Sequence, residues 1–180
     1  MSTDPKPQLT NRLGRGMAFA AWLLVLGLLS LFFTRWYHDQ QNPNRDYQTQ
    51  VTDQGAREIT LQRNRYGHYV ASGTIDSQPV VFMLDTGATD VSIPQGVATR
   101  LGLRRGAPLP VRTANGDATV YATRLDSLTL GGIGLRDVRA NINPHMGGDQ
   151  ILLGMSVLKH LELVQRGDRL TLRQYTNNNH

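Results

Sequence analysis

One continuous apolar run stands near the start of the chain, and every later apolar segment is short. Residues 17–33 read MAFAAWLLVLGLLSLFF and contain no charged residue. Their number is at the lower end of what a helix needs to cross a bilayer core. A helix buried in a soluble core would carry polar residues on one face, whereas this run is apolar on every face. We therefore predict a transmembrane helix over residues 17–34.

Aromatic and basic residues flank this helix. Trp36 and Tyr37 follow it directly, where aromatic rings suit the membrane interface. Three basic residues precede it, whereas the two arginines that follow within residues 35–46 are offset by two aspartates. This bias predicts a cytoplasmic N-terminus over residues 1–16, a single crossing of the cell membrane, and a remainder on the periplasmic or extracytoplasmic side. A cleaved signal peptide is the alternative, although residues 34–37 offer no small-x-small cleavage site.

The segment after the helix is polar. Residues 35–56 are rich in glutamine, asparagine and aspartate and show no hydrophobic period. Such a composition is typical of an extended or flexible connection. We predict that it forms a stem between the membrane and a folded domain.

From residue 57 the pattern changes to short β-type segments separated by turn residues. Asn115-Gly116 between two such segments is a strong hairpin signal. Short helices are predicted over residues 94–101 and 155–160, the first because Pro94 suits an opening helical turn. The pattern predicts an all-β domain over residues 57–176, folded as a small barrel or sandwich with one or two short helices, and a tail over 177–180. The predicted strands are 58–61, 69–75, 80–84, 91–93, 111–114, 118–123, 125–130, 135–142, 151–153, 161–164 and 170–175.

Composition removes several classes of function. The chain has no cysteine, which excludes disulfides, a cysteine nucleophile and zinc sites with cysteine ligands. Its five histidines lack metal-ligand spacing, so we predict no metal and no cofactor. The formal net charge is +5, but the arginines are scattered and the aromatic residues are not interleaved with them. A nucleic-acid partner is therefore not expected.

The segment richest in chemistry begins where an apolar strand ends on an acid. Residues 80–84 read VVFML and lead directly into Asp85-Thr86-Gly87-Ala88. A carboxylate at the end of a buried strand has a desolvation cost, so it needs partners or a function. Gly87 permits a tight turn, and Thr86 can hydrogen-bond to neighbouring backbone. Asp-Thr-Gly alone is a weak motif, because an aspartate that only opens a turn is the simpler interpretation.

The order of segments around this tripeptide is more specific. The apolar strand and Asp85-Thr86-Gly87-Ala88 are followed by the Asn115-Gly116 hairpin, and then by Ile151-Leu152-Leu153-Gly154 before a short helix. This order resembles the retropepsin-like aspartic proteases, over residues 57–175. It resembles most the bacterial branch, whose members often carry one N-terminal membrane segment. The resemblance implies a small closed acid-protease barrel.

The resemblance also implies roles for individual residues. Asp85 would be the catalytic acid, Thr86 would lock two active-site loops together, and Gly87 would line the floor of the cleft. Ala88 would lie beside the substrate. Gly154, with Leu153 before it, would let its strand pass close to the Asp85 loop. The tip of a flap over the substrate would be formed by Ala114, Asn115, Gly116 and Asp117.

Two positions depart from the retroviral pattern. Where retroviral proteases carry an aspartate just after this motif and an arginine after the second glycine, this chain has Thr89 and Met155. Both members of that ion pair are missing together, so no lone buried charge is left. Asp90 either contributes to the site or is a solvated turn residue. Ser156 lacks the closing glycine of a nucleophile elbow, so we expect it to face solvent or cap the following helix.

A single Asp-Thr-Gly implies two chains. Aspartic protease chemistry needs two carboxylates that share one proton, and Asp126-Ser127 lacks the glycine that a second motif would need. We therefore expect a homodimer in which each chain supplies one Asp85. The predicted function is a membrane-anchored aspartic endopeptidase that hydrolyses an extended peptide or protein segment. The alternative is a non-catalytic module that binds a peptide or partner on the same fold.

Overall fold

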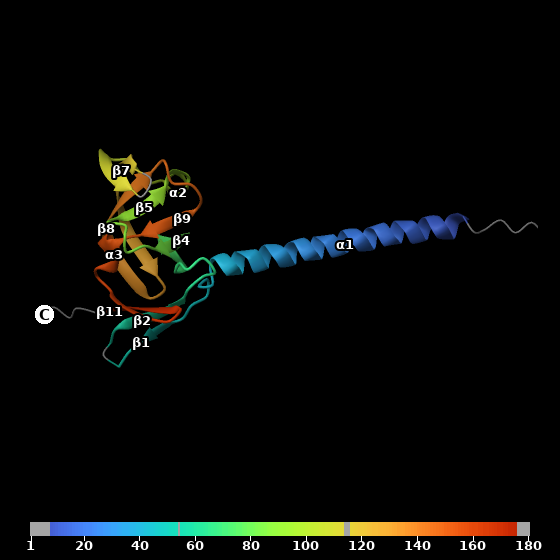
Figure 1. Ribbon diagram of the computed structural model, residues 1–180, viewed down its shortest axis with the longest axis horizontal. Coiled ribbons are helices and arrows are strands. Elements are labelled where there is room, and N and C mark those ends of the chain that lie inside the picture. The colour runs from blue at the N-terminus through green and yellow to red at the C-terminus, as the bar shows by residue number, and fades with distance from the viewer. Residues whose placement is uncertain (1–7, 54, 114–115, 176–180) are drawn as a thin grey trace, which may run out of the picture. The chain divides into compact units, whose positions relative to one another are not determined.

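The computed structural model describes residues 8–53, 55–113 and 116–175. It divides into two compact units, Met1–Gln40 and Gln41–His180. The described residues of the first unit lie in one helix, α1 (Gln8–Gln41) (Figure 1). Within it, Gly16–Tyr37 is an apolar stretch of 22 residues with no burial inside the chain. At 1.5 Å per residue this stretch is about 33 Å long, which matches a bilayer core of about 30 Å.

The second unit contains eleven described strands and two short helices (Figure 1). They confirm the predicted all-β class with short helices, and one strand, β1, lies in the segment predicted to be a stem. The elements are β1 (Thr49–Val51), β2 (Arg57–Gln62), β3 (Val70–Ile75), β4 (Gln78–Leu84), β5 (Val91–Pro94), α2 (Gln95–Arg100), β6 (Pro108–Thr113), β7 (Gly116–Leu130), β8 (Ile133–Asn143), β9 (Gln150–Leu153), α3 (Met155–Leu158), β10 (Glu162–Arg166) and β11 (Arg169–Gln174).

The larger sheet closes on itself. Its strand order is β3-β4-β9-β5-β8-β7-β6, and β3 also pairs with β7 through Thr74 and Ile75. This last pairing joins the two ends of the β3-to-β7 series, so the predicted closed barrel is confirmed. Most pairings are antiparallel, but β4 runs parallel to β9 and β5 runs parallel to β8. The parallel β4–β9 pair brings together two segments that are about 70 residues apart in the chain.

The barrel is filled by large apolar side chains. Because side chains alternate between the faces of a strand, one side of each strand supplies the core. Complete burial of a side chain of this size stabilises the folded state by about 1.5–3 kcal/mol. The largest fully buried examples include Phe82, Leu125, Ile142, Ile151 and Leu153.

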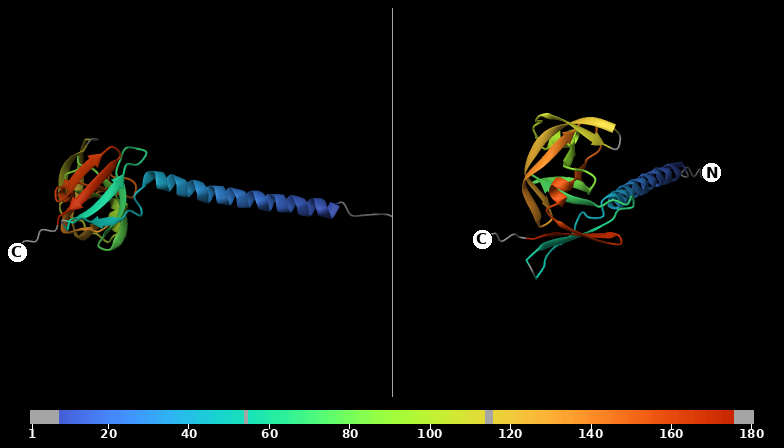
Figure 2. Two further views of the ribbon diagram at one scale, coloured as in Figure 1. Left: turned by 90° about the horizontal axis from the view of Figure 1, so that it is seen from below. Right: turned by 60° about the vertical axis from the view of Figure 1, so that its left-hand side comes forward.

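A second, four-stranded sheet lies against one end of this barrel. Its order is β1-β2-β11-β10, and every pairing is antiparallel. The views in Figure 2 show β2, β11 and β10 side by side. Its inner face carries buried Ile59, Leu61 and Leu172. Its outer face is polar, with Thr60 and Thr171 of neighbouring strands in hydroxyl contact at 3.3 Å.

The segment predicted to be a polar stem, residues 35–56, is packed against the second unit at Asn42 and Asn44. Asn42 and Asn44 are buried in the second unit, 7% and 5% exposed. The Asn44 amide donates to the carbonyl oxygens of Gln62 (2.9 Å) and Val70 (2.7 Å), and its side-chain oxygen accepts from the Gln62 N–H at 2.6 Å. Asn42 donates to the Ser72 hydroxyl at 3.1 Å. The segment is held by side-chain amides that satisfy backbone groups, so it needs no hydrophobic period to be ordered.

We expect Asn44→Ala to lower the free energy of unfolding by about 2 kcal/mol, because it leaves buried backbone groups without partners. The measurement is the urea midpoint of the full-length chain in detergent, followed by pulse proteolysis. Gln50→Ala is the matched control, since this exposed residue of β1 lies in the same segment. Equal midpoints for both variants would contradict a structural role for Asn44.

Tyr47 makes the stability of this segment sensitive to alkaline pH. Burial raises the pKa of the Tyr47 phenol to about 12, although a backbone contact with Gly131 acts in the opposite direction. An unfolded tyrosine titrates near 10, so Tyr47 favours folding fully below about pH 10, and this contribution is lost as pH rises toward 12. We expect unfolding experiments to show this loss in the wild type. The loss should be smaller in Tyr47→Phe, and identical pH profiles would contradict the assignment.

Candidate active site

Asp85 lies at the point where β4 leaves the barrel core. Its backbone N–H donates to the Leu153 carbonyl at 3.1 Å, and its own carbonyl accepts from the Ala88 N–H at 3.2 Å. Its carboxylate oxygen Oδ1 accepts a hydrogen bond from the Gly87 N–H at 2.9 Å. Asp85 is partly buried, whereas Thr86 and Gly87 are exposed on the single chain. The loop thus holds one carboxylate oxygen in place at the surface.

The structure brings the two predicted motifs together. In the parallel β4–β9 pair, Leu84 lies opposite Leu153, so the residues after each strand are neighbours. The first N–H groups of α3 then hold the loop: Met155 donates to the Ala88 carbonyl and Ser156 to the Thr89 carbonyl, both at 2.8 Å.

Gly154 stands where these two backbones approach most closely. A Cβ atom at this position would lie 2.3 Å from the Asp90 carbonyl oxygen and 2.6 Å from that of Ala88. Real Cβ atoms essentially never approach other atoms so closely. Only glycine fits here without displacement of the Asp85 loop.

The predicted flap corresponds to the β6–β7 hairpin. It lies at the end of the second unit opposite β2 and β11 (Figure 1). Gly116 has φ +109°, which favours glycine, and Asp117 forms an exposed ion pair with Arg112 at 3.6 Å. Ala114 and Asn115, which were also predicted to form the flap tip, lie outside the described residues.

Comparisons with known proteins identify the family. Residues 71–160, which include the Asp85 loop and Gly154, match the model of the family described as "gag-polyprotein putative aspartyl protease". The fold is similar to that of a retropepsin-like aspartic protease from Rickettsia conorii, known from its crystal structure. The TM-score is 0.57 at 26% identity, with 72% of this chain and 96% of the other covered. This chain belongs to the retropepsin-like aspartic proteases.

Two further relatives of this retropepsin-like chain are uncharacterized bacterial proteins. One, from the cobV 5′ region of a Sinorhizobium species, is 33% identical over 181 residues, which cover 92% of this chain and 77% of the relative. The other, RP867 of Rickettsia prowazekii, is 30% identical over 111 residues, which cover 58% of this chain and 46% of the relative. The first match extends the similarity over nearly the whole retropepsin-like chain.

An ion pair that the sequence did not predict supports the retropepsin-like loop. Arg139 of β8 donates from Nε to Asp90 Oδ1 at 2.8 Å. Asp90 is therefore not a fully solvated turn residue: 20% of its side chain is exposed, against 67% for Arg139. The pairing of β5 with β8 brings Arg139 near Asp90. This contact depends on the fold, so nothing in the sequence around Arg139 distinguishes it from a solvated arginine.

Ser156 also differs from its prediction. Its side chain is half-buried rather than solvated, and it does not cap α3. The hydroxyl accepts from the Val91 N–H and donates to the Arg139 carbonyl, each at 3.2 Å. Ser156 therefore links the start of α3 to β5 and β8 beside the Asp85 loop.

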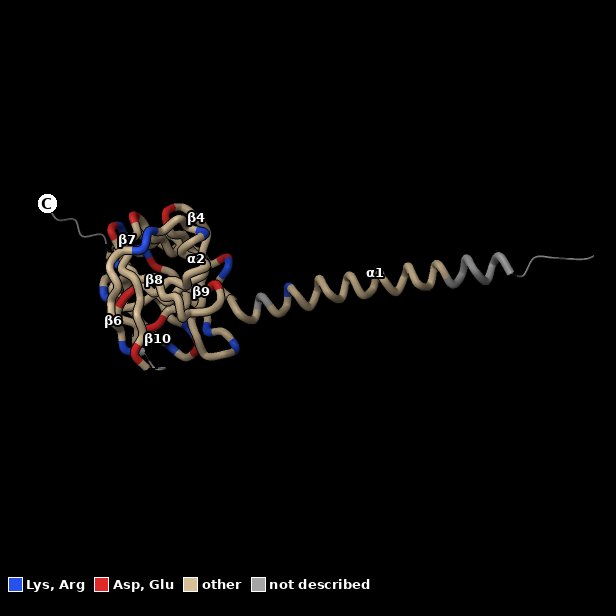
Figure 3. Tube along the Cα trace, turned by 90° about the horizontal axis from the view of Figure 1, so that it is seen from above, with Lys and Arg blue, Asp and Glu red and all other residues tan. Residues whose placement is uncertain are grey.

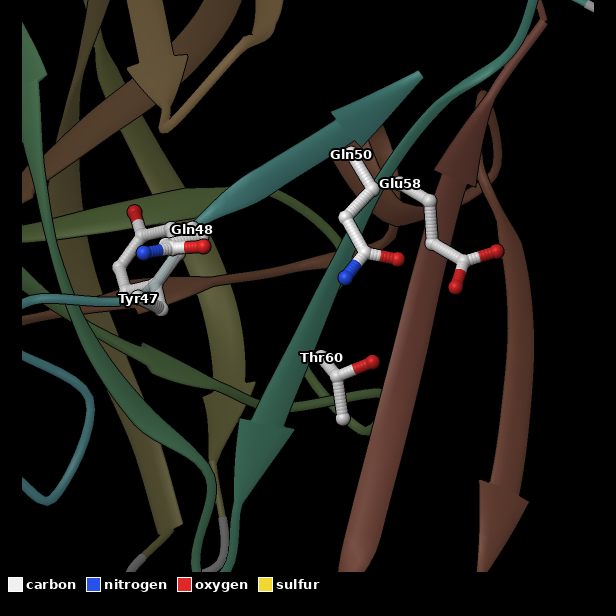
Figure 4. Close-up of a pocket in the computed structure, with 5 residues that line it drawn as sticks. All are labelled: Tyr47, Gln48, Gln50, Glu58 and Thr60. Carbon is white, nitrogen blue, oxygen red and sulfur yellow. The ribbon is translucent and has the colours of Figure 1, made fainter. Parts of the chain in front are cut away.

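A hollow lies on the outer face of the four-stranded sheet. It has a volume of about 200 Å³. Figure 4 shows its polar side chains, none of which belongs to the Asp85 loop or the β6–β7 hairpin. We therefore place the candidate active site at Asp85 rather than in this hollow. It is lined by Tyr47, Gln48, Gln50, Glu58 and Thr60.

Charge is distributed without a dominant face. Basic and acidic residues are interspersed over the second unit in Figure 3. Among the described residues, no group of three histidine, cysteine, aspartate or glutamate side chains could hold a metal ion.

Proposed function

We propose that this chain is a membrane-anchored aspartic endopeptidase that works as a homodimer. The observation that carries the proposal is the Asp85 carboxylate, which is oriented through Oδ1 by the Gly87 N–H. Within the described residues no hydrogen bond reaches its other oxygen, Oδ2. That oxygen is left for a water molecule or for a second carboxylate.

The reaction is hydrolysis of a peptide bond by water between two Asp85 carboxylates. Two carboxylates that face each other in one site share one proton, so one acts as a base and the other as an acid. The base removes a proton from water while the water oxygen bonds to the scissile carbonyl carbon, and the acid donates its proton toward the carbonyl oxygen. Breakdown of the tetrahedral intermediate transfers a proton to the leaving nitrogen and breaks the carbon–nitrogen bond, which releases an acid and an amine.

Two features of the single chain support the need for a partner. The sequence contains one Asp-Thr-Gly, so a second catalytic carboxylate has to come from another copy. Thr86 and Gly87 are exposed on the single chain although they stand beside a carboxylate that must work away from bulk water. A second copy covers them, and Thr86 then bonds across to the partner's loop.

The substrate is an extended peptide segment. Gly87 and Ala88 form the floor beneath it, and the β6–β7 hairpin, with Gly116 and Asp117 near its tip, closes over it. An extended segment between two such elements forms main-chain hydrogen bonds, as in β-strand addition. Unfolded or loop-like segments therefore suit the site better than helices or sheet strands.

The N-terminal helix anchors the enzyme in the cell membrane. It is long and apolar enough to cross a bilayer, as a membrane anchor or a signal sequence is. Only residues 38–41 separate its apolar stretch from Asn42, which is buried in the second unit. So short a tether keeps the catalytic unit near the bilayer, on the periplasmic side if the N-terminus is cytoplasmic. Substrates at or close to the membrane surface are favoured.

The test is cleavage of a diverse peptide library by the full-length chain in detergent, read by mass spectrometry. We expect cuts within the peptides that yield free acid and amine termini. The new carboxylates should carry ¹⁸O when the reaction runs in labelled water. A folded dimer that retains peptides but cuts none would support the non-catalytic binding module instead.

A further inference from the structure

The described residues include a buried pair of polar side chains that bond only to each other. Five polar residues of this part of the chain are buried, and three of them, Asn42, Asn44 and Asn64, bond to backbone groups. The other two are Ser92 of β5 and Asn141 of β8, each 8% exposed. The Ser92 hydroxyl donates to Asn141 Oδ1 at 2.9 Å. Neither side chain makes another hydrogen bond among the described residues.

This pair does not belong to the barrel core. Ser92 and Asn141 stand directly opposite each other in the parallel β5–β8 pair. Their neighbours along both strands are core residues, and successive side chains of a strand point to opposite faces. Ser92 and Asn141 therefore point away from the core. The core neighbours are Val91, Ile93, Ala140 and Ile142.

The pair continues a row of side chains that begins beside Asp85. Met83 of β4 lies opposite Leu152 of β9, and Leu152 lies opposite Ser92. Residues directly opposite on neighbouring strands share one face of a sheet, and β4, β9, β5 and β8 are neighbours in this order (Figure 1). Met83 stands two residues before Asp85, whose N–H continues the pairing with β9. The row that ends at Asn141 thus lies on the face of the Asp85 side chain.

The row changes from apolar to polar along its length. Met83 and Leu152, the half-buried residues nearest to Asp85, are apolar. At the other end, the amide nitrogen of Asn141 can donate two hydrogen bonds, and the hydroxyl oxygen of Ser92 can still accept one. Polar groups that stay unpaired in a covered site cost free energy. A substrate group that pairs with both is therefore favoured over an apolar group of the same shape.

We propose that Ser92 and Asn141 form a subsite for a carboxamide side chain of the substrate, that of glutamine or asparagine. The carboxamide oxygen accepts from Asn141 Nδ2, and the carboxamide N–H donates to Ser92 Oγ. This inference rests on the endopeptidase function proposed above and specifies its substrate class. Ser92 is two strands from β4, about 10 Å at a strand spacing of about 4.8 Å. An extended peptide advances about 3.3 Å per residue, so the carboxamide stands about three residues from the scissile bond.

The pair has a second explanation, in which its two side chains only join β5 to β8. Polar pairs between neighbouring strands stabilise a sheet without any ligand. That role predicts no dependence on the substrate side chain. Competition between two peptides in one tube separates the two explanations, because the ratio of their kcat/KM values does not depend on the amount of folded enzyme.

The first experiment gives such pairs of peptides to the full-length chain in detergent. Each pair is derived from a cleaved library peptide and differs at one position within four residues of the cut, with glutamine in one peptide and methionine of similar size in the other. We expect one position at which the glutamine peptide has an about tenfold higher kcat/KM. Equal cleavage at every position, or a preference for methionine throughout, overturns the subsite. Glutamate lacks the N–H that Ser92 would accept, so a preference for glutamate over glutamine overturns the carboxamide assignment.

The second experiment repeats the competition with variants of the row. Asn141→Leu has a similar shape but no donor, so the preference for glutamine should be lost. Thr129→Val is the matched control, since it removes a hydroxyl contact with Thr74 at 2.7 Å between β3 and β7, outside the row. It should keep the wild-type ratio. Ser92→Ala, a smaller change in case Asn141→Leu does not fold, should lower the ratio about threefold. A wild-type ratio in both row variants, or an equal shift in the control, overturns the proposal.

Binding separates the subsite from the proposed chemistry. An Asp85→Asn chain lacks the carboxylate that activates water, so its affinity for library peptides can be measured without cleavage. We expect it to bind the glutamine peptide with an about tenfold lower Kd than the methionine peptide. Cleavage without preference overturns the subsite alone. Binding with this preference, when the wild type cuts no peptide, overturns the protease function and supports the subsite. A folded chain that neither cuts nor binds peptides overturns both.

Discussion

Replacement of Asp85 by asparagine is expected to lower peptide cleavage by about 10³-fold or more, because removal of a general acid–base group costs up to about 10⁴-fold. Asparagine has nearly the same shape and can still accept the Gly87 N–H that orients Oδ1. Its amide, however, cannot take a proton from water or donate an acidic one. The loss should therefore appear in kcat, with the fold and the dimer unchanged.

The measurement compares kcat/KM for a cleaved peptide between wild-type and Asp85→Asn chains in detergent. Asp126→Asn is the matched control, since Asp126 is exposed and precedes a serine but lacks the glycine of the motif. It should retain wild-type activity. Retention of more than a tenth of the activity by Asp85→Asn would contradict a catalytic role for this carboxylate.

The same variant tests whether the two carboxylates come from two chains. With exchange between protomers and an equal amount of Asp85→Asn, random pairing leaves the wild-type chains about half of their original activity. Asp126→Asn added in the same way should cause no loss. Undiminished activity in the first mixture, after exchange has been verified, would show that one chain carries a complete site.

Local patterns in the sequence were sufficient to predict most strands and both short helices. Alternating apolar residues and turn signals are properties of neighbouring residues, so β4, β8 and β11 could be predicted directly. Closure of the barrel is not visible in local patterns and could be predicted only from the family resemblance, because the β3–β7 contact joins residues more than 50 positions apart. The two strands predicted over 118–123 and 125–130 form one long strand, β7, and the lone polar residue between them gives no sign of this.

The ordered part of the predicted stem shows a different limit. Asn42 and Asn44 belong to a residue type that usually marks loops, and their neighbours carry no apolar period. Their burial depends on free backbone groups of Gln62 and Val70, which become adjacent only when β2 and β3 are in place. The residue type alone shows that burial of an amide is costly, but it does not show which hydrogen-bond partners in the folded chain offset that cost.

In the candidate site, too, contiguous residues could be predicted from the sequence and a contact between distant residues could not. Asp85, Thr86 and Gly87 are contiguous, so their motif could be found in the sequence. Arg139 could not, since only the parallel pairing of β5 with β8 brings it to Asp90. The predicted roles of the contiguous residues in catalysis stay predictions, for which the experiments above supply the test.

Gly154→Ala is expected to destabilise the second unit by about 3 kcal/mol, at the upper end of the usual cost of overpacking. Gly154 has φ −91°, a value that any residue adopts, so the cost is steric rather than conformational. The added methyl group would meet backbone atoms of Asp90 and Ala88, with three of them within 2.9 Å. These atoms belong to the loop that α3 holds, so relief of the contact must move the Asp85 loop away from α3.

Gly96→Ala is the control that makes this result specific. Gly96 is an exposed residue of helix α2 with nothing within 4 Å of an added Cβ atom. The same chemical change should raise stability there by about 0.5 kcal/mol, because alanine restricts the unfolded chain more than glycine does. Urea midpoints of the two full-length variants should therefore lie on opposite sides of the wild type.

Because its clash lies in the loop that carries the carboxylate, Gly154→Ala should also lose cleavage at urea concentrations where it is still folded. A folded Gly154→Ala chain with wild-type stability and activity would show that the Asp85 loop tolerates displacement, and a rigid loop would then not be needed to place the carboxylate.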